Sequence, residues 1–214
     1  MDCKEIVKLY KKYQAKENKN WEYANSILYR MCEEEPYHNS KHVIAGKILL
    51  IGRSYAAAIE RRKNAKESND DFYYNKVAPQ ILSNSKKLDS LIITLRQSKN
   101  TIEEDLSIIL KTHNFLTSIF AKLTGLEKRS LASKYLHFHC PNKFFIYDSR
   151  ANTTIKKLIK KSNHNIHKQS KNVDPEYGNF VCRMIELQKY LEEHTGKNLT
   201  PRELDSFLLS LNNV

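Results

Sequence analysis

The sequence predicts an all-α protein of about ten helices, folded over residues 1–214 as one domain or as two closely packed lobes. Three observations favour this class. Apolar residues recur at intervals of three and four along most of the chain, which is the period of an amphipathic helix. The chain has only 5 glycines and 5 prolines, so helical runs are seldom interrupted. The clearest strand-like run is short, Phe144-Phe145-Ile146-Tyr147.

Two early helices and one later helix are marked by apolar residues at helical spacing. These residues are Ile6, Leu9, Tyr10 and Tyr13, then Trp21, Ala24, Leu28 and Met31, and then Leu88, Leu91, Ile92 and Leu95. The pattern places Trp21 in the core rather than at a stacking surface. The polar cluster Ser68–Asp71 is expected to be a loop.

A longer helix is expected between these elements. Asn39 or Ser40 can cap its start, because either side chain accepts a hydrogen bond from a first-turn amide. Its apolar stripe continues through Tyr55 and Ile59, so we expect it to end near Arg61-Arg62 and to lie buried at the centre.

Capping signals divide the second half of the chain into further helices. Thr101 with Glu104 is a capping box, and Thr200-Pro201-Arg202-Glu203 is another helix start. The expected helices run from Thr101 to Gly125, onward to about His139 before Pro141, from Ser149 to about Lys161, from Asp174-Pro175 to Gly196, and from Thr200. The polar segment 162–173 is expected to be a mobile loop.

Composition indicates the kind of partner and compartment. The chain has 36 Lys and Arg against 24 Asp and Glu, a formal charge of +12, which favours a polyanion such as nucleic acid. Its cysteines form no CxxC pair, so we expect reduced thiols in a cytoplasmic protein; they are Cys3, Cys32, Cys140 and Cys182. No signal peptide or membrane-length apolar run is present, and the sequence does not indicate an oligomeric state.

One carboxylate, Asp148, stands alone in a long basic segment. Residues 128–173 contain eleven Lys or Arg and four His, and Asp148 is the only acid among them. A polyanion could lie along such a surface, since neutralising phosphates releases counterions. Asp148 is therefore a candidate catalytic residue. The alternative is that it only caps the helix that begins at Ser149.

The residues before Asp148 form a recognisable order. Leu123-Thr124-Gly125-Leu126 predicts a tight glycine turn between two helices, a geometry that can present backbone amides to a phosphate. The apolar segment 144–147 then leads to Asp148 at the start of the next helix. Over about forty residues, within 101–161, this order resembles the helix-hairpin-helix DNA glycosylases. The resemblance implies an enzyme that flips out a modified base and hydrolyses its N-glycosidic bond, with Asp148 as the catalytic carboxylate.

This sequence departs from the family pattern at two positions. Glu127 replaces the second glycine of the hairpin and would repel a phosphate that it faced. Arg129, nineteen residues before Asp148, takes the position of the lysine that cuts the strand in some members. Arginine cannot form a Schiff base, although the adjacent Lys128 could if the match shifts by one residue. We therefore expect a monofunctional glycosylase that leaves an abasic site.

The remaining candidate residues fall into two groups. Residues expected to bind DNA are Gly125, Lys128, Arg129, Lys134, Arg150, Lys156 and Lys157, with Lys160 and Lys161 beside them. Residues expected to line a base pocket are Arg53, Tyr55, Glu60 and Tyr147, because polar groups within apolar runs need partners. Arg53 and Glu60 could instead form an internal ion pair while Tyr55 packs, and the lysine pairs could be a solvated helix face.

Neither a metal nor another cofactor is expected. His137 and His139 diverge on a helix, and no paired cysteine completes a tetrahedral site. The hypothesis is thus a DNA glycosylase, with a role in phage defence against hypermodified cytosines suggested by analogy. The alternative is a non-catalytic, basic, helical nucleic-acid-binding protein. An RNA-directed nuclease or toxin is a third possibility, for which the sequence shows no catalytic pair.

Overall fold

The computed structural model describes residues 3–15, 21–162 and 173–211, and the fold and site below refer to them. The prediction of an all-α protein is confirmed, since these residues contain helices and no strand. With the continuous run α4–η2–α5 taken as one rod, the described residues form ten helices besides one short 3-10 turn. They are α1 Cys3–Gln14, α2 Glu22–Glu34, α3 Lys41–Ser54, the rod Asn69–Leu82, α6 Ser85–Gln97, α7 Leu106–Thr124, α8 Arg129–His139, α9 Ser149–Leu158, α11 Pro175–Thr195 and α12 Pro201–Ser210.

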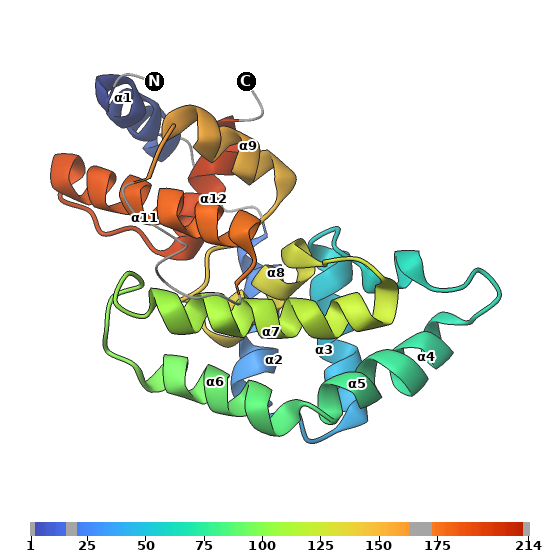
Figure 1. Cartoon of the computed structure of the whole chain (residues 1–214). Helices are drawn as coiled ribbons and strands as arrows, with labels where there is room; N and C mark the ends of the chain where they lie inside the picture. Colours follow the sequence, from blue (N-terminus) through green and yellow to red (C-terminus); the bar gives the residue numbers. More distant parts are fainter. Residues whose placement is uncertain (1–2, 16–20, 163–172, 212–214) are drawn as a thin grey trace.

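The helices pack as two groups (Figure 1). The terminal helices, α1, α9, α11 and α12, contact one another in the upper part of the view, although α1 is far from the others in sequence. The central helices, α2 to α8, contact one another below them. The chain therefore crosses between the groups twice, once between α1 and α2 and once between α8 and α9.

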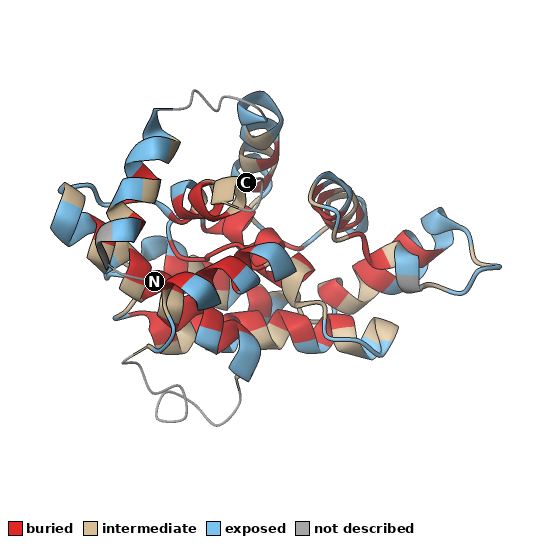
Figure 2. Ribbon diagram, turned by 90° about the horizontal axis from the view of Figure 1, so that it is seen from above, coloured by how far each residue is buried: buried red, intermediate tan, exposed pale blue. Residues whose placement is uncertain are grey.

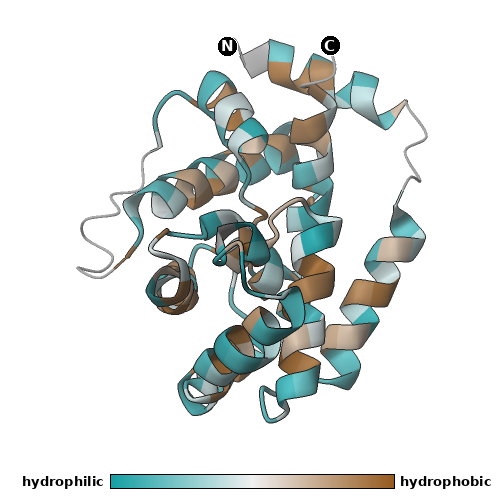
Figure 3. Ribbon diagram, turned by 90° about the vertical axis from the view of Figure 1, so that its right-hand side faces the viewer, coloured by the Kyte–Doolittle hydropathy of each residue, from teal (hydrophilic) through white to brown (hydrophobic). Residues whose placement is uncertain are grey.

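Helix α8, rather than α3, is the most deeply buried helix. Every residue from Leu131 to His139 is buried, and α8 contacts α2, α3 and α7. Figure 2 shows the buried residues gathered at the centre, and Figure 3 shows that most helices carry both apolar and polar stretches. The amphipathic helices packed around α8 bury their apolar stripes against it.

The prediction of a single helix to Arg61-Arg62 is wrong. Helix α3 is capped at Ser40, as expected, but it ends at Ser54. Ala56 adopts a left-handed conformation (φ 52°), and the amide of Ala57 donates to the carbonyl oxygen of Gly52 at 2.7 Å. These features form a Schellman turn. Alanine gives no sequence signal for such a turn, which normally contains glycine. A separate 3-10 turn, η1 Ile59–Arg62, follows.

The Ser68–Asp71 cluster starts a helix instead of forming a loop. Ser68 Oγ accepts the amide of Asp71 at 3.0 Å and caps α4 Asn69–Asp71. The rod continues as the π-helix η2 Phe72–Val77 and as α5 Ala78–Leu82. Proline in α5 has no amide to donate, and the wider π turn before it accommodates that missing bond. The altered spacing of buried residues hides this helix from a search at period 3.6.

Boundaries in the second half agree closely with the capping signals. Gly125 and Gly196 end α7 and α11, each with a φ of 68°. Thr200 and Glu203 form the capping box of α12. The prediction that a helix starts at Thr101 is wrong, because the box there closes a short turn and α7 begins only at Leu106. The predicted loop 162–173 has residues 163–172 outside the described part of the chain.

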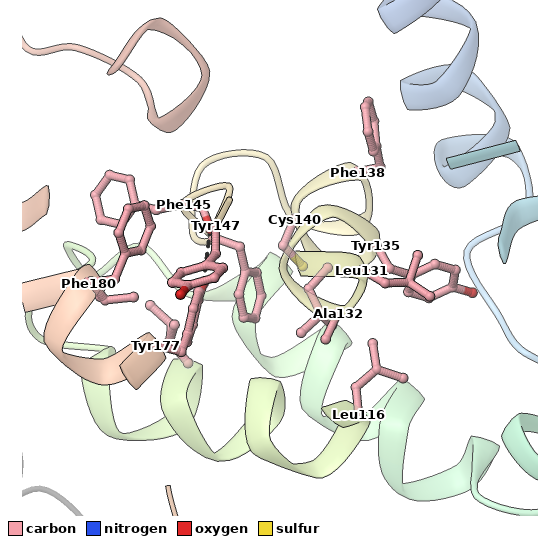
Figure 4. Packing of buried hydrophobic residues seen from close by; sticks show 14 of the residues in the cluster. Leu116, Leu131, Ala132, Tyr135, Phe138, Cys140, Phe145, Tyr147, Tyr177 and Phe180 are labelled. Carbon is pink, nitrogen blue, oxygen red and sulfur yellow. Dashed lines mark hydrogen bonds between the residues drawn. The ribbon is translucent and has the colours of Figure 1, made fainter. Parts of the chain in front are cut away.

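The strand-like segment 144–147 is extended but pairs with no strand in the described residues. Side chains hold its backbone instead. His137 Nδ1 bonds to the carbonyl oxygen of Phe144 at 2.8 Å, and Tyr177 Oη donates to that of Phe145 at 3.1 Å. The amide of Tyr147 donates to Ser133 Oγ at 2.9 Å. Figure 4 shows Phe145 and Tyr147 lying beside the rings of α11. This buried segment therefore carries the chain from α8 to Asp148 in a set direction.

The composition predicted reduced cysteines and no apolar run long enough to span a membrane. Cys32, Cys140 and Cys182 are free and buried, as expected of thiols used as small core residues. Among the described helices, none combines the length and apolar character needed to cross a membrane.

Candidate functional site

A hairpin joins α7 to the buried helix α8, as the glycine turn predicted. We call residues 124–128 the Gly125 hairpin. The amide of Gly125 donates to the carbonyl oxygen of Ala121 at 2.8 Å. The amide of Leu126 donates to Thr124 Oγ1 at 3.3 Å, so a side chain occupies a donor that a phosphate contact would need. Helix α8 begins at Lys128 without a side-chain cap.

Gly125→Val is expected to weaken DNA binding and to destabilise the fold by about 1–2 kcal/mol, because a β-branched residue strains the left-handed backbone. A Cβ atom would meet no heavy atom within 4 Å, so the strain comes from the φ of 68° alone. Gly196→Val is the matched control, since Gly196 has the same φ and open space at the end of α11. DNA titration and thermal melting of both variants test this. Equal DNA binding by both variants would contradict a role for the Gly125 hairpin.

Asp148 lies where the extended segment meets α9. Its Oδ1 accepts the amide of Ala151 at 2.9 Å, so it does cap the helix. Its Oδ2 is 3.6 Å from Arg150 Nη2, and its side chain is 19% exposed. One oxygen is therefore used by the cap, while the other faces a cation and remains reachable from solvent. Capping and a chemical role are compatible in this geometry.

Lys134 of α8 is a buried lysine, with 3% of the residue exposed. Its Nζ donates to Ser130 Oγ at 2.7 Å and to the carbonyl oxygen of Tyr55 at 3.3 Å. Burial lowers the pKa of Lys134, and the nearby carboxylates Asp148 and Asp205 oppose that shift. The sequence placed this lysine at a DNA-binding surface. In the structure it is an internal cation beside the candidate catalytic acid.

A second carboxylate, Asp205 of α12, completes the charge arrangement. Its Oδ2 is 3.0 Å from Arg202 Nη1, and its buried Oδ1 has no hydrogen-bond partner among the described residues. Burial raises the pKa of Asp205 to about 6, Arg202 opposes the rise and Asp148 adds to it. Asp205 can thus take up a proton close to neutral pH, whereas Asp148 is partly exposed. Two carboxylates in different environments are a common basis for acid and base roles.

Tyr55 joins the same site from the turn after α3. Its hydroxyl donates to Asn25 Oδ1 of α2 at 2.7 Å. Lys134 Nζ lies 5.9 Å from the centre of its ring, and Arg202 Cζ lies 5.6 Å from it. We call the residues that converge here the Asp148 cluster; they are Tyr55, Lys134, Asp148, Arg150, Arg202 and Asp205.

Arg129 is engaged in a separate network. Its guanidinium forms ion pairs with Glu127, Asp174 and Glu176. The longest of these is the pair between Arg129 Nη1 and Glu176 Oε2, at 3.3 Å. Glu176 also accepts a hydrogen bond from the hydroxyl of Tyr147 at 2.6 Å. Three carboxylates on one guanidinium leave little positive potential for a phosphate. Lys128 has an interaction of its own at the start of α8.

The other pocket candidates lie outside the Asp148 cluster. Arg53 Nε is 2.8 Å from Glu60 Oε1, and Tyr73 donates to the same carboxylate. Arg53 and Glu60 therefore form the ion pair that was the alternative to a base-pocket role. The pair is not internal, because the Arg53 side chain is 52% exposed. Tyr147 packs edge-on against Phe180, with ring centres 5.2 Å apart. Of the four pocket candidates, Tyr55 alone is in the Asp148 cluster.

A basic surface extends from Asp148 along α9. Arg150 and Lys157 are exposed and lie seven residues apart, so they occupy the same helix face. Lys156 is exposed beside them, and the exposed Lys160 and Lys161 follow α9. The DNA-binding candidates on α9 thus adjoin Asp148, as the basic segment predicted.

Replacing Lys156, Lys157, Lys160 and Lys161 together with Gln is expected to weaken binding to unrelated DNA sequences alike. The slope of log affinity against log salt should shrink by about 0.9 for each phosphate that the variant no longer neutralises. The control removes the same charge from exposed lysines on α6, α7 and beyond α11, namely Lys86, Lys111, Lys122 and Lys197. Equal salt slopes in the two variants would exclude α9 from the DNA-binding surface.

Three residues of this site escaped the sequence analysis: Asn25, Arg202 and Asp205. A signal existed for Asp205, which follows Leu204 on the apolar stripe of α12 and is buried with it. An acid on the buried face of an amphipathic helix requires a partner. Asn25 carries no such signal, because its contact to Tyr55 joins segments thirty residues apart.

Comparisons with family models, with characterised proteins and with solved structures find no match to this chain. Within the described residues, no group of three or more metal-ligating side chains occurs. The chemistry open to the Asp148 cluster is therefore that of its own side chains. It offers a partly exposed carboxylate at a helix start, a second carboxylate that holds a proton near pH 6, and cations that offset both.

Proposed function

We propose that this protein is a DNA glycosylase that hydrolyses the N-glycosidic bond of a modified base and leaves an abasic site. The observation that carries the proposal is the placement of Asp148. A buried, extended segment delivers it to the start of α9, where the chain passes between the two helix groups and where the basic surface begins. A carboxylate beside a DNA backbone repels phosphate, so its presence among cations calls for a chemical purpose.

The reaction needs a fixed negative charge at this position. Breaking the bond between sugar and base develops positive charge on the sugar, which a nearby carboxylate stabilises. Such a group also orients or deprotonates the attacking water. Arg150 and Lys134 offset the repulsion between Asp148 and phosphate. Lys134 is the lysine of the Asp148 cluster, and its Nζ is buried and donates to Ser130 Oγ and to the carbonyl oxygen of Tyr55, which supports direct hydrolysis over strand cleavage through a Schiff base.

The main alternative is a basic helical module that binds nucleic acid without chemistry. The hydrogen bond between Asp148 and the amide of Ala151 supports it, because that bond alone gives the carboxylate a structural use. Under this alternative, Asp148 could be exchanged for any good capping residue without functional loss.

A base-release assay separates the two. The protein is incubated with genomic DNA from phages that carry different modified bases, including hypermodified cytosines, and with unmodified DNA. Abasic sites are detected chemically, and released bases are identified by mass spectrometry. We expect release from modified DNA only, and an assignment to phage defence follows if hypermodified cytosine is the base released. DNA binding without release from any substrate in the panel would favour the non-catalytic module.

A further inference from the structure

Two large aromatic side chains stand exposed at the start of α2. Trp21 is 75% exposed and Tyr23 is 78% exposed. The expectation that Trp21 belongs to the core is therefore wrong. Trp21 is the chain's only tryptophan, and tryptophan is usually well buried. An exposed ring of this size often marks a contact surface.

Trp21 lies one turn before Asn25, at the start of α2. The carbonyl oxygen of Trp21 accepts the amide of Asn25 at 2.9 Å. In sequence, Trp21 stands at helical spacing from the buried residues Leu28 and Cys32, which explains why periodicity assigned it to the core.

The backbone at Trp21 is also unusual. Its φ is 73°, a left-handed conformation that bulky residues rarely adopt, and no side chain caps the helix there. A strained conformation at an exposed aromatic residue is typical of functional surfaces.

Trp21 is connected to the Asp148 cluster through one residue. Asn25 accepts the hydroxyl of Tyr55, and the carbonyl oxygen of Tyr55 accepts Lys134 Nζ. Moreover, α1 belongs to the terminal helices and α2 to the central helices, so Trp21 is the first described residue after the chain passes between the groups. Trp21 and the candidate catalytic acid therefore each lie where the chain passes between the two helix groups.

We propose that Trp21 is a stacking platform for an unpaired nucleobase of the DNA strand bound at the Asp148 cluster. This proposal rests on the proposed function and adds how the base is held. A nucleobase is favoured as the occupant because the formal charge of +12 and the exposed cations Arg150 and Lys157 suit a polyanionic strand. Tryptophan stacks on any base, since every base has a π face.

The single tryptophan makes the test direct, because all tryptophan fluorescence reports this position. Duplex DNA that contains one unpaired base is titrated into the Asp148→Asn variant, which is expected to bind without releasing the base. Stacking should quench the fluorescence as DNA binds. Trp21→Ala should weaken affinity roughly tenfold and Trp21→Phe much less, with unchanged salt slopes, because stacking releases no counterions.

Tyr23→Ala is the matched control, since Tyr23 is as exposed as Trp21 but lies inside α2, two residues further along the chain. It should bind DNA with wild-type affinity, and melting curves should show all three variants folded. Unquenched fluorescence with saturating DNA, or equal affinities for Trp21→Ala and wild type, would overturn the stacking role. Base release would then still stand as a separate result. Quenching by vesicles of phosphatidylcholine and phosphatidylserine, but not by DNA, would also overturn it.

Discussion

Asp148→Asn is expected to slow base release by a hundredfold to a thousandfold while DNA binding is unchanged or tighter. The missing charge no longer stabilises the sugar cation, a loss of about 3–4 kcal/mol for a well-placed electrostatic group. Asparagine still accepts a hydrogen bond from the amide of Ala151, so α9 should remain capped. Removing a negative charge beside phosphates favours binding. Single-turnover release and DNA titration measure the two effects.

Two controls separate charge from fold. Asp70→Asn removes the same charge from an exposed residue of α4, and it should change neither release nor melting. Asp148→Ser keeps a capping side chain without a carboxylate, and it should be as inactive as Asp148→Asn. Release at the wild-type rate by either Asp148 variant would mean that this residue is only a cap and that the proposed mechanism is wrong.

Two buried histidines are expected to contribute about 5 kcal/mol of destabilisation between pH 7 and pH 4.5. Burial lowers the pKa of His113 to about 3 and that of His137 to about 4, from 6.5. A group whose pKa is lowered by folding binds its proton more readily in the unfolded chain. The stability it contributes is therefore complete above pH 6.5 and is lost as the pH falls toward the folded value.

This loss is a large fraction of the free energy of unfolding of a typical domain, which is about 5–15 kcal/mol. The raised pKa of Asp205 acts in the opposite direction, since its stabilising effect is lost as the pH rises through about 6. Denaturant unfolding at a series of pH values measures the net effect. His42→Gln is the control, because His42 is exposed and should leave the pH dependence unchanged.

His137 links this acid effect to the site. Its Nδ1 donates to the carbonyl oxygen of Phe144, so its Nε2 is the acceptor for the hydroxyl of Tyr29 at 2.6 Å. Protonation of Nε2 would remove the acceptor for the Tyr29 hydroxyl and place a buried positive charge on the ring that holds Phe144, in the segment that delivers Asp148. NMR titration of the histidine rings gives a direct check. A folded-state pKa near 6.5 for His137 would contradict both the buried neutral state and its share of the acid loss.

Much of the fold could be predicted because helix ends carry local signals. Thr200 with Glu203 and Asp174 with Pro175 start helices as expected, and Gly125 and Gly196 end them. Each signal acts within one turn, so neighbouring residues are enough to specify it. The failures arose where the local signal was absent. Ala56 takes a turn conformation that normally calls for glycine, and the rod 69–82 departs from the usual helical period.

The candidate site, too, could be predicted only where neighbouring residues specify it. That Asp148 begins a helix after a buried extended segment, with a basic surface beyond it, follows from residues adjacent in sequence. Which charges face one another does not, because side chains that meet in space come from segments far apart in the chain. Folding brings Asp174 and Glu176 to Arg129 and brings Asp205 near Asp148. The segment 128–173 has one acid in its sequence, but acids from other segments surround it in the folded protein. Burial also turned Lys134 from an expected DNA contact into an internal cation and left Trp21 exposed, since packing between distant helices sets exposure.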